Sequence, residues 1–161
     1  MSDARDDSRG MIPMEETNDG AHRFRLVIPG FHRYVGSTRR FVMSICRLGG
    51  VGEEDRDSIG LALTEILNNS IDHGEGSEEH PLELEIEIRP GSVKLAVTET
   101  AAGSWDAPDM EQAADDARKS SPDDSQFRGR GLLLVCTLMD EMKVRAAPHG
   151  GTIVEVVKHT G

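Results

Sequence analysis

The stretch LALTEILNNSIDHGEG, residues 61–76, decides the fold because it combines an apolar helical stripe with a polar one. Its apolar residues recur every three to four positions, and this pattern extends back to Glu53. Gly74 is typical of the position just after a helix end. We therefore predict one long helix over about 53–73 that buries its apolar stripe against the rest of the molecule.

The polar stripe of this helix places a carboxylate and an amide one turn apart. At about 100° per residue, Glu65, Asn69 and Asp72 fall within about 60° of one another, and His73 follows one turn beyond Asn69. A solvated helix face usually carries lysine or arginine, yet neither occurs between Glu65 and His73. An amide oxygen suits Mg²⁺, and a carboxylate can deprotonate an attacking hydroxyl, so the stripe is a candidate site for phosphate chemistry. From this helix alone, a purely structural role is the alternative.

The remaining elements follow from periodicity and turn residues. We predict strands where apolar and polar residues alternate, and helices where apolar residues recur with helical spacing. The predicted strands are 22–29, 82–89, 93–99, 143–147 and 151–159, and the predicted helices besides 53–73 are 31–48 and 131–142. This order predicts an α+β fold, a two-layer α/β sandwich in which helices cover one face of a mostly antiparallel, mixed sheet.

Length and composition favour one domain with two poorly patterned segments. We predict a disordered acidic tail at 1–20, a single domain at 21–161 and, within it, a mobile lid at about 104–130. The first 20 residues lack an apolar signal-peptide core and no run of 18 apolar residues occurs, so we expect a cytoplasmic protein that does not span a membrane. The formal net charge of −11 disfavours direct binding to nucleic acid or anionic membranes. Both cysteines lie in apolar helical patterns, where we expect buried, reduced thiols.

A second candidate motif is RGRGLLLV, residues 128–135, in which Gly129 and Gly131 flank Arg130 directly before an apolar helix. Free N–H groups at a helix start, next to glycines and an arginine, can hold a phosphate. The stretch is neither a P-loop nor a dinucleotide fingerprint, because the lysine of the first and the third glycine of the second are missing. On this motif alone, a flexible loop without a ligand is the alternative.

Together these stretches resemble the motifs of the anti-sigma factor serine-protein kinases. That family is the short single-domain branch of the superfamily of gyrase, heat-shock chaperone and histidine-kinase ATPases. Residues 65–74 resemble its N-box, residues 129–135 with 138–140 are similar to its second glycine box, and residues 150–152 resemble its last hairpin. The resemblance covers about 22–160 and implies a Bergerat-type ATP-binding fold.

The resemblance implies a bacterial serine/threonine-protein kinase that uses ATP with Mg²⁺. Glu65 would be the general base toward a hydroxyl of the protein substrate, and Asn69 would hold the metal. The implied nucleotide-binding residues are Asn69, Asp72, His73, Glu99, Gly103, Gly129, Arg130, Gly131 and Thr152. The implied substrate is an anti-sigma factor antagonist, the second implied partner is a sigma factor that the kinase sequesters, and a homodimer is a further implied assembly.

One motif departs from the family pattern. In VTETAAGSWD, residues 97–106, Glu99 stands where the family has an aspartate and Ala101 replaces the first glycine, whereas Gly103 is kept and Trp105 stands near the aromatic position. Glu99 shares the phase of the apolar strand residues, so we expect it to point inward; a solvent-facing strand end is the alternative.

Two functions therefore stay open. The first is an anti-sigma kinase, and the second is a divergent, non-catalytic partner-binding module with weak or lost nucleotide binding. A third interpretation, the catalytic domain of a sensor histidine kinase, is disfavoured because none of the six histidines suggests a phospho-accepting helix pair.

Overall fold

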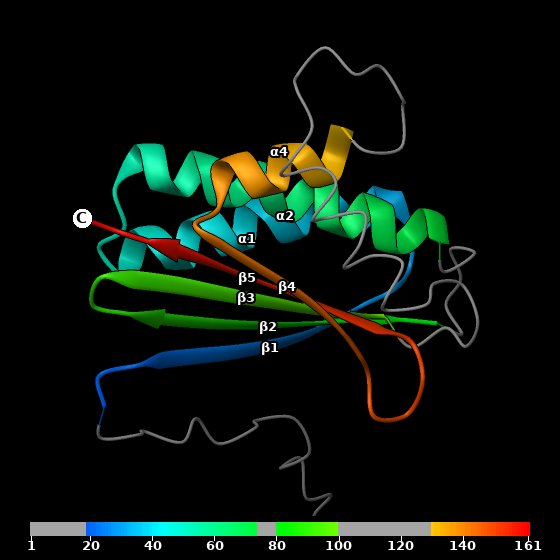
Figure 1. The fold of residues 1–161 in the computed structure, drawn as a ribbon. Coiled ribbons are helices and arrows are strands. Elements are labelled where there is room, and N and C mark those ends of the chain that lie inside the picture. The colour runs from blue at the N-terminus through cyan, green and yellow to red at the C-terminus, as the bar shows by residue number, and fades with distance from the viewer. Residues whose placement is uncertain (1–18, 74–79, 100–129) are drawn as a thin grey trace, which may run out of the picture.

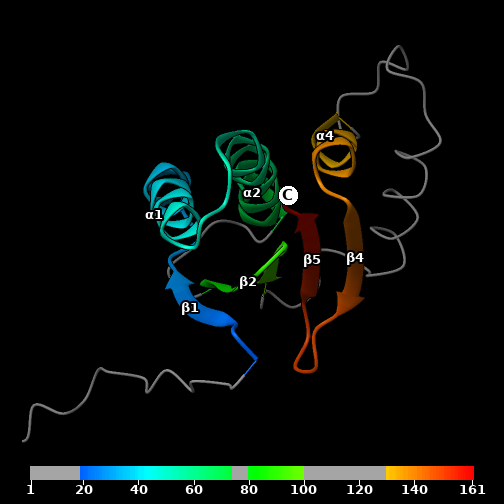
Figure 2. The same cartoon turned by 90° about the vertical axis from the view of Figure 1, so that its left-hand side faces the viewer.

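The computed structural model describes residues 19–73, 80–99 and 130–161. Within these residues, three helices cover one face of a single five-stranded sheet (Figures 1 and 2). This confirms the predicted α+β, two-layer architecture. The tail predicted at 1–20 and the lid predicted at 104–130 lie outside the described residues apart from their last positions, so both stay predictions.

The sheet has the strand order β1-β2-β3-β5-β4. Its strands are β1 (His22–Ile28), β2 (Leu82–Arg89), β3 (Ser92–Glu99), β4 (Glu141–Ala146) and β5 (Thr152–His159). Every pairing between these described strands is antiparallel, so the parallel pairs of a mixed sheet do not occur among them. The helices are α1 (Val35–Leu48), which follows the 3-10 turn η1 (His32–Tyr34), α2 (Glu53–His73) and α4 (Arg130–Leu138).

The strict alternation of β2 explains why the helices lie on only one side of the sheet. Its four aliphatic side chains are at most 3% exposed and belong to the core beneath the helices; they are Leu82, Leu84, Ile86 and Ile88. Its glutamates lie on the opposite face. There Oε2 of Glu87 is 2.7 Å from Nε of Arg23, and Oε2 of Glu83 is 2.6 Å from Nη2 of Arg25. Because the outer face is charged and paired, a second helical layer on that face would bury ions at a cost.

Helix α2 is the central element of the helical layer, with α1 on one side and α4 on the other (Figure 2). Its bounds are those predicted from the sequence, and its apolar stripe is almost fully buried. Ile59 and Leu63 are inaccessible to solvent, and Ile66 is 2% exposed. Each buried aliphatic side chain contributes about 1.5–3 kcal/mol through removal of apolar surface from water. None of the helices in the described residues is both long and apolar enough to cross a membrane.

Two predicted helix boundaries are wrong. The helix expected from residue 31 starts as the turn η1 and becomes α-helical only at Val35. The helix expected to continue to residue 142 ends at Leu138, and β4 begins at Glu141. The buried Met142 and Val144 alternate with exposed neighbours, so this segment follows the sheet's period of two.

The two cysteines differ in their surroundings. Neither forms a disulfide, Cys46 is fully buried, and Cys136 is only partly buried, which corrects the expectation of two buried thiols. Burial raises the pKa of the Cys46 thiol to about 11, an effect that the positive charge of Arg56 partly opposes. The thiolate, which is the reactive form, is therefore scarce at Cys46 near neutral pH.

We expect iodoacetamide to modify Cys136 well before Cys46 in the native protein at pH 8, as followed by mass spectrometry of peptides. The folded-state pKa of Cys46 lies above its ordinary value of 9.0. Burial of the neutral thiol therefore stabilises the folded state fully below pH 9.0, and this part of the free energy of unfolding is lost as the pH rises to about 11. Equal labelling of the two thiols at pH 8 would contradict this assignment.

Candidate functional site

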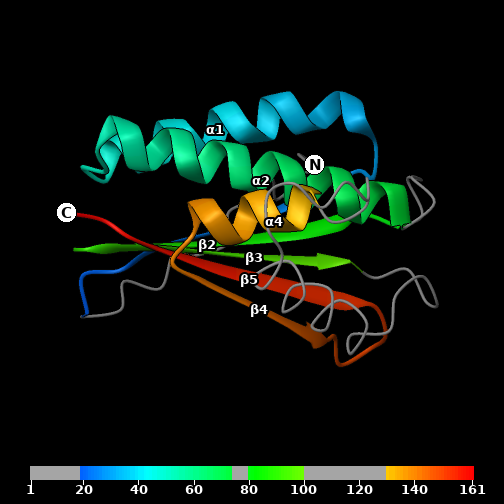
Figure 3. The ribbon, with the colours of Figure 1, turned by 45° about the horizontal axis from the view of Figure 1, so that its top comes forward.

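Gly131, in the first turn of α4, faces the polar stripe of α2. A β-carbon built on Gly131 would lie 2.9 Å from Oε2 of Glu65 and 3.3 Å from Nδ2 of Asn69. The first of these distances is shorter than real β-carbon contacts, so a side chain at this position would displace the carboxylate. The carboxylate, the amide and the start of a glycine-containing helix, which come from two separate motifs in the sequence, therefore lie together. Figure 3 shows the two helices, α2 and α4, side by side.

This arrangement has the chemistry that a triphosphate and its metal ion require. The first N–H groups of α4 have no partner within the helix, and a helix start carries partial positive charge. Glu65 and Asn69 are only half-buried, so a ligand can reach them.

The described residues contain no cluster of three or more histidine, cysteine or acidic side chains suited to a metal. A Mg²⁺ ion here would depend on the Asn69 oxygen together with phosphate oxygens, which is a common way of holding this metal. The residues present therefore fit ATP with Mg²⁺.

Asp72 lies in a different environment from Glu65 and Asn69. Its Oδ1 is 2.8 Å from Nε2 of His32, whose Nδ1 is 3.0 Å from Oδ1 of Asn68. These contacts join the turn η1 to the last turns of α2. Sequence patterns did not predict His32 and Asn68 as partners of this end of α2, because the fold brings His32 together with residues 36 and 40 positions later in the chain. The nucleotide-binding roles of Asp72 and of His73, the last residue of α2, stay predictions.

Glu99 and Thr152 form a buried polar pair at one end of the sheet. They are opposite each other in the β3–β5 pairing, and they are only 5% and 3% exposed. The expected inward orientation of Glu99 is confirmed, and the alternative of a solvent-facing strand end is wrong. A buried carboxylate next to a buried hydroxyl presents hydrogen-bonding groups away from water, which is a property of sites that recognise polar ligands.

Three further predicted residues precede α4 in the sequence or begin it. Gly103 and Gly129 lie outside the described residues, as do Ala101 and Trp105 of the altered motif. Arg130 is the first residue of α4, so the backbone at this position belongs to the helix start that contacts the polar stripe of α2. The roles of all three stay predictions.

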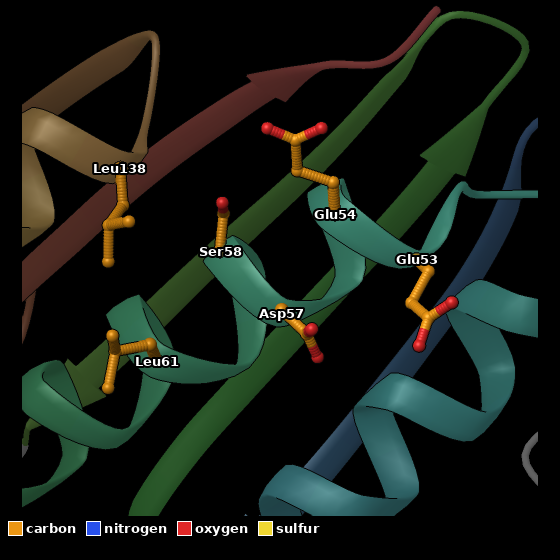
Figure 4. A pocket seen from close by; sticks show the side chains of 6 residues that line it. All are labelled: Glu53, Glu54, Asp57, Ser58, Leu61 and Leu138. Atoms are coloured by element: carbon orange, nitrogen blue, oxygen red, sulfur yellow. The ribbon is translucent and has the colours of Figure 1, made fainter.

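The other end of the α2–α4 pair holds a hollow of about 500 Å³ (Figure 4). Its lining consists of Glu53, Glu54, Asp57, Ser58, Leu61 and Leu138. None of the predicted site residues is among them. Because α4 starts beside Glu65 and ends at this hollow, it runs antiparallel to α2.

Known proteins resemble this chain in sequence. The model of the histidine kinase-like ATPase domain matches residues 28–158. An anti-sigma F factor of Pasteuria penetrans is 30% identical over 107 residues, which are 65% of this chain and 69% of that protein. The serine-protein kinase RsbW of Bacillus velezensis is 27% identical over 136 residues, which are 82% of each chain.

The likeness extends to a solved structure. A chain in the crystal structure of the SiaB–SiaC complex from Pseudomonas aeruginosa superposes with a TM-score of 0.68 at 10% identity, covering 86% of this chain and 90% of that one. At this identity the superposition supports the fold alone. The sequence matches identify the family. The chain belongs to the histidine kinase-like ATPase domain family, within which it is a distant homologue of the RsbW and anti-sigma F factor kinases.

Proposed function

We propose that this chain is a cytoplasmic anti-sigma regulatory factor that binds ATP with Mg²⁺ and phosphorylates a serine or threonine of an antagonist protein. In the same proposal it sequesters a sigma factor. The observation that supports the kinase part is the close approach of Gly131 to Glu65 and Asn69. In the proposal these two side chains are the base and the metal ligand, and the start of α4 binds phosphate. The names of the relatives, an anti-sigma F factor and a serine-protein kinase, support the choice of partners.

Each residue of the site has a defined task in this proposal. ATP with Mg²⁺ supplies the phosphoryl group and the charge neutralisation that its transfer needs. The Glu65 carboxylate accepts the proton of the substrate hydroxyl and so makes its oxygen a better nucleophile. The Asn69 oxygen holds the metal, and the N–H groups at the start of α4 hold phosphate oxygens.

The buried pair at the end of the sheet supplies nucleotide recognition. Glu99 accepts a hydrogen bond from the exocyclic amine of adenine, and Thr152 lies next to it across the β3–β5 pairing. Glutamate reaches about one methylene further than the aspartate of the family pattern. Ala101 in place of a glycine restricts the backbone nearby. Both changes favour the second candidate, a module that binds partners with weak or lost nucleotide binding.

One experiment separates the two candidates. The purified protein is incubated with γ-labelled ATP, Mg²⁺ and candidate antagonist proteins encoded near its gene, and labelled residues are identified by mass spectrometry. The kinase proposal expects label on a serine or threonine of one antagonist. Binding of a sigma factor without ATP binding or label would identify the non-catalytic module instead.

A further inference from the structure

Buried polar side chains gather at one end of the described molecule. The buried polar residues in the described part of the chain are Thr38, Ser70, Glu99 and Thr152. All except Thr38 belong to elements that meet at the end of the molecule where α2 and β3 finish and β5 begins (Figures 1 and 3). Because a buried polar group costs free energy unless it is hydrogen-bonded, these three side chains need partners.

Ser70 lies on the side of α2 that faces the sheet. It continues the spacing of the core residues Ile59, Leu63 and Ile66. At about 100° per residue, all four side chains point within about 60° of one another. Helix α2 contacts both β3 and β5, and its last turns lie over the end of β3 and the start of β5. Ser70 is therefore on the same side of α2 as the buried carboxylate and hydroxyl of the sheet.

The hydroxyl of Ser70 differs from the other buried or half-buried hydroxyls of the helices. Oγ1 of Thr64, on the same helix, donates a hydrogen bond to the carbonyl oxygen of Gly60 at 2.8 Å. Ser70 is only 6% exposed, yet within the described residues its hydroxyl makes no hydrogen bond. The hydroxyl of Thr152, which is 3% exposed, has no side-chain hydrogen bond in the described part of the chain either. Two buried donors are therefore available to a bound molecule.

We propose that Ser70 is a specificity-determining residue that donates a hydrogen bond to a ring nitrogen of adenine; this inference rests on the ATP binding proposed above. Adenine carries an exocyclic amine, which donates, between two ring nitrogens, which accept. The carboxylate of Glu99 suits the amine, and a hydroxyl suits the adjacent nitrogen. Guanine and hypoxanthine have a carbonyl oxygen in place of the amine, so they would bring an acceptor against the Glu99 carboxylate. The pair therefore selects adenine.

The position of Ser70 next to Asn69 fits one continuous site. Consecutive helical residues point about 100° apart, so the two side chains serve neighbouring sides of α2. Asn69 faces Gly131 at the start of α4, where the triphosphate and its metal are proposed to bind. Ser70 faces the sheet, where Glu99 is buried. One turn of α2 thus contacts the phosphate end of the nucleotide on one side and the base on the next.

A purely structural role for Ser70 makes a different prediction. Alanine has a higher helix propensity than serine, and Ser70→Ala also removes a buried hydroxyl that has no partner among the described residues. The variant should therefore raise the melting temperature of the nucleotide-free protein by about 2 °C or more under either role. Only the proposed role predicts that the same variant weakens ATP binding, so affinity separates the two.

The test is calorimetric titration of the full chain, with Mg²⁺, by ATP, 1-deaza-ATP and 7-deaza-ATP. Each analogue lacks one of the two ring nitrogens beside the amine. We expect the wild-type chain to bind one analogue about tenfold or more weakly than ATP, because the Ser70 hydroxyl then loses its acceptor. Ser70→Ala should bind ATP about tenfold or more weakly and should bind ATP and that analogue within about twofold of each other. The matched control is Ser58→Ala, the same substitution near the other end of α2, which should keep wild-type affinities within about twofold.

Three results would overturn the inference. Equal binding of ATP and both analogues by the wild-type chain would show that neither ring nitrogen is recognised. Unchanged ATP affinity in Ser70→Ala, or the same discrimination as in the wild type, would assign the hydrogen bond to another group. Both results leave the proposed nucleotide site intact. Absence of binding of all three nucleotides to the wild-type chain would instead overturn the ATP-dependent function together with this inference.

Discussion

Glu65→Gln is expected to lower phosphoryl transfer to the antagonist at least about 100-fold while leaving ATP affinity within about threefold. Glutamine keeps the size and the hydrogen-bonding oxygen of the side chain but cannot accept the proton of the hydroxyl at neutral pH. The loss should therefore appear in the rate constant of transfer and not in the binding of nucleotide. Single-turnover transfer of labelled phosphate, with a parallel binding titration, measures the two quantities separately.

The matched control for this substitution is Glu54→Gln. Glu54 lies on the same helix but lines the hollow at the other end of the α2–α4 pair. The control removes the same charge from α2 and should leave the transfer rate within about twofold. Wild-type transfer by Glu65→Gln would remove Glu65 from the role of base, and a loss of ATP binding would assign it to the binding of nucleotide.

Gly131→Ala is expected to lower transfer about 10- to 100-fold without lowering the melting temperature. The new methyl group would lie 2.9 Å from Oε2 of Glu65 and 3.3 Å from Nδ2 of Asn69. Both atoms are at the ends of flexible side chains, so they can move away at little cost in stability, but the carboxylate then leaves its position. Alanine also has a higher helix propensity than glycine by about 1 kcal/mol, which offsets the crowding.

Gly36→Ala is the matched control in α1. The nearest atom to a β-carbon on Gly36 is Nη1 of Arg40, at 3.7 Å, which is an ordinary contact. This variant should keep the wild-type transfer rate and should be at least as stable in thermal denaturation. If Gly131→Ala transfers phosphate as fast as Gly36→Ala does, the carboxylate of Glu65 is not placed by the close approach of α4.

Periodicity was sufficient to predict the elements that form the core. The bounds of α2 and β2 follow from apolar residues with helical and alternating spacing, and the turn between β2 and β3 follows from Pro90 and Gly91. Gly91 has a φ of 82°, a conformation in which glycine is strongly favoured. The same alternation predicted the inward orientation of Glu99, which decided between a buried and a solvent-facing carboxylate.

Local patterns were insufficient where tertiary contacts decide. Leu138 and Met139 fit both a longer helix and the connection to β4, and the boundary became clear only from the pairing of β4 with β5. Asp72 shares the polar stripe of α2 by angle, but its carboxylate contacts His32, which lies 40 residues earlier in the chain. Periodicity orders residues along one helix and contains no information on which distant side chain will face them.

The most direct test of the account is calorimetric titration of ATP in the presence and absence of Mg²⁺. The central claim, that Asn69 and the start of α4 form a metal–triphosphate site, predicts binding by the wild-type chain that Mg²⁺ strengthens. Asn69→Ala should lose about tenfold or more of the affinity measured with Mg²⁺, whereas Asn68→Ala, the neighbouring amide that contacts His32, should lose less than about threefold. Absence of heat with the wild-type chain at high protein concentration, or an Mg²⁺ dependence unchanged in Asn69→Ala, would contradict the claim.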